Sequence, residues 1–135
     1  MEKITVMRTI NVKQVVTEEF KKKAALEIQN TLKKVDNDIE VFDKQTKKTI
    51  TELTLKGHPQ INQIKQQVEN ERGKLNNYKQ QLLEQLKAVS KLNLGEEIVQ
   101  GTIDGPMDIK VGDSFENLNK VEVVIKDGVV VEIRG

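Results

Sequence analysis

The side chains best suited to chemistry in this sequence are one histidine, two serines and a group of acidic residues near the C-terminus. His58 is the only histidine and the chain has no cysteine, so a zinc site lacks its usual ligands. Ser90 and Ser114 lie in no GxSxG pattern and have no histidine near them in the sequence, so neither has an evident activating base. The sequence predicts no catalytic residue, and we expect a protein that is not an enzyme.

The acidic residues raise the question of a calcium or magnesium site. Their spacing matches no EF-hand loop, and aspartate and glycine are favoured in tight turns for conformational reasons alone. Residues 101–105 are interpreted as such a turn, and no phosphate-binding glycine motif is present. We therefore expect no metal and no cofactor. The acidic residues concerned are Asp104, Asp108, Asp113, Glu116 and Asp127.

Lysine offers the clearest binding chemistry. The chain carries a net charge of only +1, but residues 16–95 hold fifteen basic and eleven acidic side chains, whereas the rest of the chain holds seven and ten. Clustered lysine and arginine can bind RNA or DNA because counterion release supplies much of the affinity. Interspersed acidic residues favour a merely solvated helix surface as the alternative. The candidate nucleic-acid-binding residues are Lys21, Lys22, Lys23, Lys33, Lys34, Lys47, Lys48, Arg72 and Lys74.

These lysines belong to two expected helices. Apolar residues recur every three or four positions over residues 20–53, after Thr17 as a candidate N-cap, and Gly57 and Pro59 end the pattern. A second helix begins near Gln60, repeats apolar residues every seven positions, and ends before Gly95. The short connection near residues 57–60 makes the helices antiparallel neighbours. We predict a coiled-coil helical hairpin over residues 17–95.

The two ends of the chain are expected to form strands. Apolar and polar residues alternate over residues 3–16, which indicates a half-buried strand. Further strands are predicted at 97–103, 107–111, 120–126 and 129–134, and Asp127-Gly128 is a strong hairpin signal. Since short strands need a shared sheet, residues 1–16 and 96–135 are predicted to form one small β-barrel-like unit. The expected fold class is α+β, with the helical hairpin inserted between the first strand and the others.

Three segments resemble the YlqD family of small bacterial proteins, and the similarity extends over nearly the whole chain. They read ITVMRTINVKQVVTEEFKKK, QQLLEQLKAVSKLNLGEEIVQGTIDG and IKVGDSFENLNKVEVVIKDGVVVEIRG. The resemblance implies a bacterial cytoplasmic protein with a coiled-coil insert and a β-barrel-like end. It also implies that nucleic-acid binding is a function to consider, and it carries over no catalytic residue.

The sequence also predicts where the protein acts. No apolar stretch approaches the length of a membrane span, and the N-terminus lacks the apolar core of a signal peptide. The absence of cysteine fits a reducing compartment. We expect a soluble cytoplasmic protein with no membrane partner.

Protein interaction is the function that these features favour most. The hypothesis is a scaffolding module that binds a protein partner, or a second copy of itself, through the helical hairpin and the β-unit. Nucleic-acid binding by the lysines is the alternative. Apolar residues beside or off the helix seams are the candidates for homo-oligomer contacts. They are Leu26, Val41, Leu55, Leu83 and Leu86.

Overall fold

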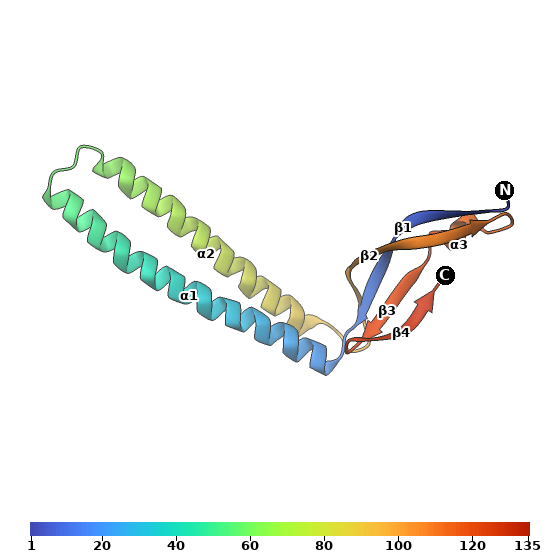
Figure 1. Ribbon diagram of the computed structural model, residues 1–135. Coiled ribbons are helices and arrows are strands. Elements are labelled where there is room, and N and C mark those ends of the chain that lie inside the picture. The colour runs from blue at the N-terminus through green and yellow to red at the C-terminus, as the bar shows by residue number, and fades with distance from the viewer. The chain divides into compact units, whose positions relative to one another are not determined.

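The computed structural model describes residues 1–135 as a sheet built from both chain ends, with two long helices between them in the sequence (Figure 1). The chain divides into two compact units, Lys23–Lys91 and the combination of Met1–Lys22 with Leu92–Gly135. The α+β class is confirmed. The elements in order are β1 (Lys3–Val15), α1 (Glu18–Leu55), α2 (Ile61–Lys91), β2 (Glu97–Lys110), α3 (Phe115–Leu118), β3 (Glu122–Lys126) and β4 (Val129–Arg134).

The sheet has four strands in the order β2-β1-β3-β4. β1 pairs with β2 in antiparallel fashion along nearly its whole length, and it pairs with β3 in parallel over four residues, from Asn11 to Gln14. β3 and β4 form an antiparallel hairpin around Asp127 and Gly128, as the sequence predicts. Asp127 has a φ of 50° and Gly128 a φ of 81°, which is the backbone geometry that favours this pair of residues in a tight turn.

The predicted β-barrel is wrong, because the sheet is open. Closure would require β2 to pair with β4, and these strands instead form the two opposite edges. β3 and β4 have five and six residues, compared with 13 and 14 in β1 and β2. The short strands therefore accompany only part of the β1–β2 ribbon, and the sheet does not curl into a closed ring.

The two strands predicted at 97–103 and 107–111 are also wrong, since a single strand, β2, replaces them. The segment interpreted as a turn, residues 101–105, continues the pairing with β1: Thr102 lies opposite Asn11 and Gly105 opposite Arg8. Pro106 lies opposite Met7 and is tolerated because β2 is an edge strand. The sheet consequently has four strands and not five.

Helix α1 begins and ends on local signals that the sequence contains. The Thr17 hydroxyl accepts a hydrogen bond from the Phe20 N–H (3.0 Å), which confirms the predicted N-cap. At the other end Gly57 has a φ of 65°. The His58 N–H donates to the Leu53 carbonyl (3.0 Å) and the Gly57 N–H to the Thr54 carbonyl (3.1 Å), the two bonds of a Schellman motif.

Within Lys23–Lys91 the two helices run antiparallel, side by side (Figure 1). Asp36 forms an ion pair with Lys79 (2.6 Å) and Asp43 with Arg72 (3.2 Å), so residues farther along α1 meet residues earlier in α2. Val35 and Leu82 are the buried apolar residues of this unit, 4% and 5% exposed. None of the helices is both long enough and apolar enough to cross a membrane. Helix α2 ends at Lys91, four residues before the predicted stop at Gly95.

Candidate interaction surfaces

The sheet has one polar face and one apolar face, and strand register assigns residues to each. One row across all four strands consists of Thr102, Asn11, Glu122 and Arg134. The next row consists of Gly101, Val12, Val123 and Ile133. Because successive residues of a strand point to opposite faces, these two rows lie on opposite sides of the sheet.

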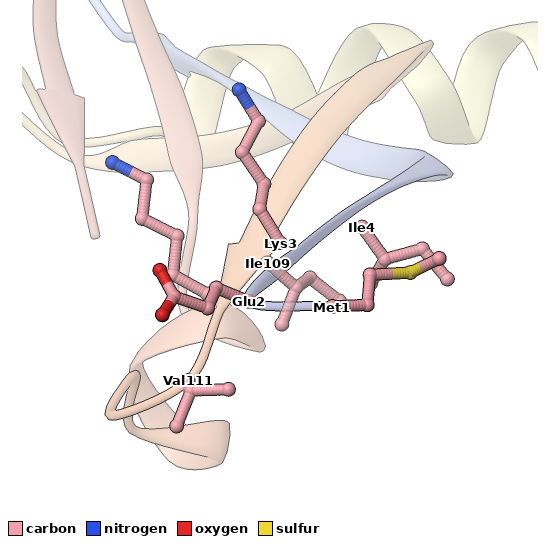
Figure 2. A pocket seen from close by; sticks show the side chains of 7 residues that line it. Met1, Glu2, Lys3, Ile4, Ile109 and Val111 are labelled. Carbon is pink, nitrogen blue, oxygen red and sulfur yellow. The ribbon is translucent and has the colours of Figure 1, made fainter.

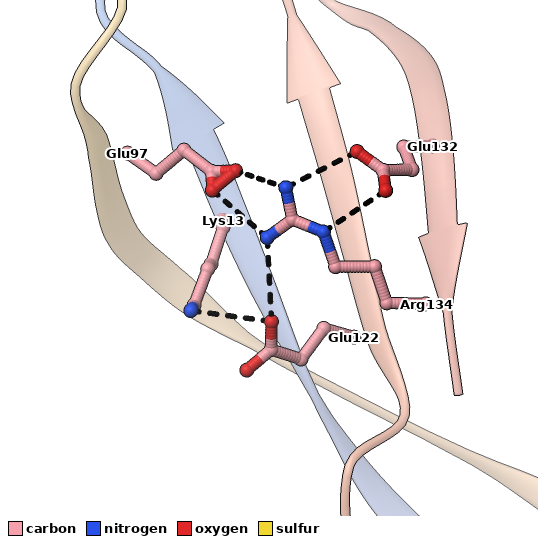
Figure 3. A network of polar contacts seen from close by, with 5 residues as sticks. All are labelled: Lys13, Glu97, Glu122, Glu132 and Arg134. Carbon is pink, nitrogen blue, oxygen red and sulfur yellow. Dashed lines mark hydrogen bonds and ion pairs between the residues drawn. The ribbon is translucent and has the colours of Figure 1, made fainter.

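The polar face carries a charged network that joins all four strands (Figure 3). Arg134 of β4 donates two hydrogen bonds to the carboxylate of Glu97 on β2 and others to Glu132 (3.1 Å). The Glu122 carboxylate on β3 lies 3.7 Å from Arg134 and 3.2 Å from Lys13 of β1. A guanidinium fork that engages a carboxylate with two donors fixes the relative position of both groups. The network therefore acts as a polar clasp across an otherwise open sheet.

Hydrogen bonds shift the ionisation of this face. Those from Arg134 lower the pKa of Glu97 below its ordinary value near 4.5, and those from Glu97 and Glu132 raise the pKa of Arg134. Hydrogen bonds from Thr5 and then Lys3 lower the pKa of Asp108. Every shift stabilises the charged form, so these groups stay ionised near neutral pH and none is poised to exchange a proton there.

The apolar face is only partly covered. Its residues lie opposite one another in register, for example Ile4 with Ile109 and Ile10 with Ile103. Ile4, Ile103 and Ile133 are 52%, 50% and 73% exposed. In the unit that contains the sheet, only Val16 and Val124 are buried apolar residues. The apolar residues of this face are Ile4, Val6, Ile10, Val12, Ile98, Ile103, Met107, Ile109, Val123, Ile125 and Ile133, and two polar residues of β1, Arg8 and Gln14, lie on the same face.

A hollow of about 290 Å³ lies where β1 begins and β2 ends (Figure 2). Its lining combines the apolar residues Ile4 and Ile109 with Lys3, and Lys3 is already paired with Asp108 (3.0 Å). Met1 and Val111, which also line it, are highly exposed. The hollow thus extends the exposed apolar surface of the sheet and brings together no set of groups suited to catalysis.

Four of the five acidic residues considered for metal binding, all except Glu116, accept hydrogen bonds with their side chains. Asp104 and Asp108 lie in β2 and accept hydrogen bonds from Thr9 and Thr5 of β1, each at 2.6 Å. Asp113 accepts one from the Lys110 N–H (2.8 Å) in the turn after β2. No group of three or more potential ligand side chains comes together in the structure. His58 accepts a hydrogen bond from the Gln60 N–H (3.1 Å) in the turn between the helices.

The structure divides the candidate nucleic-acid-binding residues into two groups. Lys21 donates a hydrogen bond to the Leu92 carbonyl (2.8 Å), Arg72 pairs with Asp43, and Lys74 pairs with Glu71 (3.3 Å). The other six take part in no ion pair and are exposed on α1. They are Lys22, Lys23, Lys33, Lys34, Lys47 and Lys48.

The candidate self-association residues do not form one patch. Leu26, Val41 and Leu55 are 57%, 44% and 83% exposed, but they are 15 and 14 residues apart, which places them roughly 20 Å from one another along α1. Leu83 is 40% exposed, and Leu86 is half-buried. Single exposed apolar residues are normal on a helix surface.

Sequence reasoning missed the clasp and the exposure of β4. Glu132 and Arg134 alternate with apolar residues in β4, a pattern that could have placed them together on one face of the strand. All four apolar residues of β4, Val129, Val130, Val131 and Ile133, are 54% to 73% exposed. The sequence predicted a strand at 129–134, and the structure shows in addition that this strand is uncovered on both faces.

These features define a class: a mixed α+β protein in which an open four-stranded sheet is formed by both chain ends and two antiparallel helices are inserted between its first two strands. The family described as YlqD protein matches residues 4–134. The chain therefore belongs to the YlqD family. No curated protein matches it.

A solved structure shares this fold. It is the crystal structure of a protein of unknown function from Synechococcus sp. WH 8102, 28% identical in sequence, with a TM-score of 0.74. The match covers 98% of this chain and 95% of the other. The similarity thus extends over both the sheet and the helical insertion.

Proposed function

We propose that this protein is a non-catalytic interaction module that docks a protein partner on the apolar face of its sheet. The observation that supports the proposal most directly is the exposure of that face. Ile4, Ile103 and Ile133 are each at least half exposed, and the face continues into a hollow lined by both apolar and charged residues. Contiguous exposed apolar surface on a folded domain marks an interaction site more often than a solvated one.

The polar clasp supports a binding role for the sheet in a second way. Arg134 and its partners link the four strands from the polar face, so the apolar face is not the only source of the sheet's cohesion. A surface that is held in shape before it meets its partner loses less conformational entropy on binding. For the helices, we propose that α1 and α2 pack against each other along a coiled-coil seam.

A cross-linked pull-down from native cells, with and without nuclease, tests the proposal. The variant Ile103→Glu places a charge on the apolar face, and Thr102→Glu places the same charge on the polar face of the same strand. We expect the wild type and Thr102→Glu to recover a protein partner, but not Ile103→Glu. Nuclease treatment should not reduce this recovery. Equal recovery with both variants, or no protein above background, contradicts the proposal.

Nucleic-acid binding by α1 is the second candidate, and one arrangement favours it. Lys23, Lys34 and Lys48 are separated by 11 and 14 residues, close to three and four helical turns, so they lie along one line of the helix. None of the three takes part in an ion pair. Such a row could contact phosphates that lie about 16–21 Å apart on a nucleic acid.

Salt dependence tests this candidate. If the row binds RNA, log K should fall as log salt concentration rises. Replacing all three lysines by glutamine should then make this slope less steep, by about 2. Lys74→Gln is the control, because Lys74 is already paired with Glu71 and should change the slope little. Negligible affinity of the wild type at low salt would remove nucleic-acid binding from consideration.

A further inference from the structure

Arg8 is the only charged residue that the strands place on the apolar face of the sheet. It lies near the middle of β1, between Val6 and Ile10 on the same face, and opposite Gly105 of β2. The other charged residues of the four strands belong to the polar face by their register. The exposed apolar face thus carries a single positive charge.

The guanidinium of Arg8 has no carboxylate partner. Its Nη2 donates a hydrogen bond to the side-chain oxygen of Asn119 (3.1 Å), and its buried Nε makes no hydrogen bond. Its remaining nitrogen, Nη1, also makes none and is not buried. The chain has two other arginines, Arg72 and Arg134, and each forms an ion pair with a carboxylate. Arg8 is therefore the one arginine whose charge is not balanced by an acidic residue of this chain.

The surface next to Arg8 is open on the side of β2. Gly105, directly opposite, has no side chain, and a Cβ added there would meet no atom within 4 Å. Ile103, the next residue of β2 on the same face, is 50% exposed. A docking segment can therefore lie across the apolar residues and reach Arg8.

Docking a protein on this face would remove water from Arg8. A guanidinium that loses its water without gaining a counter-charge costs free energy, so a partner that binds tightly must supply a negative group. One guanidinium balances the single charge of one carboxylate. Nη1 and the second hydrogen of Nη2 form a fork that two carboxylate oxygens can accept, while Asn119 keeps the first.

We propose that the partner docks with an acidic residue that pairs with Arg8, and with apolar residues on both sides of it that cover Val6 and Ile10. This inference rests on the proposed function and adds the chemistry of the segment that the face binds. Val6 and Ile10 each lie roughly 7 Å from Arg8 along the strand, so the partner's apolar residues lie at about this distance from its carboxylate. An arginine among apolar contacts is a common energetic centre of protein interfaces.

Selection from a displayed library of random short peptides tests the predicted preference. We expect peptides selected on the wild-type protein to contain aspartate or glutamate with apolar residues close to it on both sides. Arg8→Glu reverses the charge, so we expect it to select peptides with lysine or arginine in place of the acidic residue. Far-UV circular dichroism checks that each variant is folded.

Fluorescence anisotropy with one selected acidic peptide measures the contribution of Arg8. Arg8→Gln should weaken binding by about 10- to 100-fold, the range of a hydrogen bond to a charged group. Arg8→Lys should weaken it less, because lysine keeps the charge and loses only the fork. Asn119→Ala is the matched control, since it removes the same hydrogen bond within the chain and leaves the guanidinium in place. It should change the affinity little.

A change in the peptide completes the test. Replacing its acidic residue by the corresponding amide should weaken binding to the wild type about as much as Arg8→Gln does. The same peptide change should hardly affect binding to Arg8→Gln, because the two groups act on each other. Independent, additive losses would show that the carboxylate binds elsewhere and would overturn the inference, even if Arg8→Glu does not fold.

Other outcomes separate this inference from the proposed function. Selected peptides with no acidic preference, whose binding is lost in Ile103→Glu, refute the role of Arg8 and leave docking on the apolar face standing. Equal losses of affinity in Arg8→Gln and Asn119→Ala also refute it, because Arg8 would then act only through the fold. A library that yields no peptide overturns the inference, and the pull-down then decides the proposed function by itself.

Discussion

Two glycines of the helical unit should respond in opposite ways to the same substitution. Gly73 lies inside α2, and Gly57 ends α1 with a φ of 65°. A Cβ added at either position meets no atom within 4 Å, so packing does not distinguish them. Alanine at position 73 should stabilise the helix by about 1 kcal/mol. At position 57 an L-residue must adopt the left-handed conformation, and we expect a loss of about 1–2 kcal/mol.

Thermal unfolding followed by circular dichroism at 222 nm measures both effects. Lys23–Lys91 is one compact unit, and for a unit of this size 1 kcal/mol corresponds to a shift of roughly 4–8 °C in Tm. Gly73→Ala should raise the midpoint and Gly57→Ala should lower it. Gly57→Asn should lose less than Gly57→Ala, because asparagine tolerates the left-handed conformation better.

A shift of the same sign for the two alanine variants would refute this reasoning. So would an unchanged midpoint for Gly57→Ala, since the Schellman motif would then contribute nothing to the end of α1. The double variant is a further check. The two sites share no contact, so its shift should be close to the sum of the single shifts.

Three more predictions follow from other contacts. Thr17→Ala removes the N-cap of α1 and should cost about 1 kcal/mol in urea unfolding, whereas Thr17→Ser should retain the cap. Leu82 is 5% exposed, so Leu82→Ala should lower the free energy of unfolding by about 2–5 kcal/mol. The neighbouring Leu83 is 40% exposed, so Leu83→Ala should lower it much less. Equal losses would contradict the proposed packing of Leu82 between the helices. Arg134 lowers the pKa of Glu97, so this carboxylate contributes stability that is complete above its ordinary pKa near 4.5 and is lost as the pH falls through its lowered folded-state pKa. In urea titrations from pH 6 to pH 2, Arg134→Gln should therefore lose less stability on acidification than the wild type, and an identical loss would show that the clasp is not responsible.

The helices could be predicted because their signals are local. A seam of apolar residues every three or four positions fixes the buried side of a helix, and Thr17 and Gly57 mark the two ends of α1 by backbone geometry. Neither signal depends on what lies elsewhere in the chain. The end of α2 was harder, because the residues after Lys91 carry no comparable stop and Gly95 lies in the following turn.

The architecture of the sheet could not be predicted in the same way. Whether β2 and β4 pair depends on strand lengths and twist, which no single segment encodes. Gly101 and Gly105 suggest a turn when only local preference is considered, but β1 provides a partner for every residue of β2 except Gln100. The clasp was missed for a similar reason, since Glu97 and Arg134 are 37 residues apart and meet only when the strands are ordered.

The junction between the strands and the helical insertion constrains how the molecule can vary. The Val16 N–H donates to the Glu96 carbonyl and the Gly95 N–H donates to the Val16 carbonyl, each at 2.8 Å, so β1 and β2 remain paired up to the point where the insertion leaves them. In topological terms, 78 residues take the place of the tight loop of an ordinary β-hairpin. A two-residue Asn-Gly loop could bridge the same gap, and such an excision should leave the sheet able to form. Conversely, relatives could lengthen or shorten both helices together in steps of seven residues and keep the same sheet.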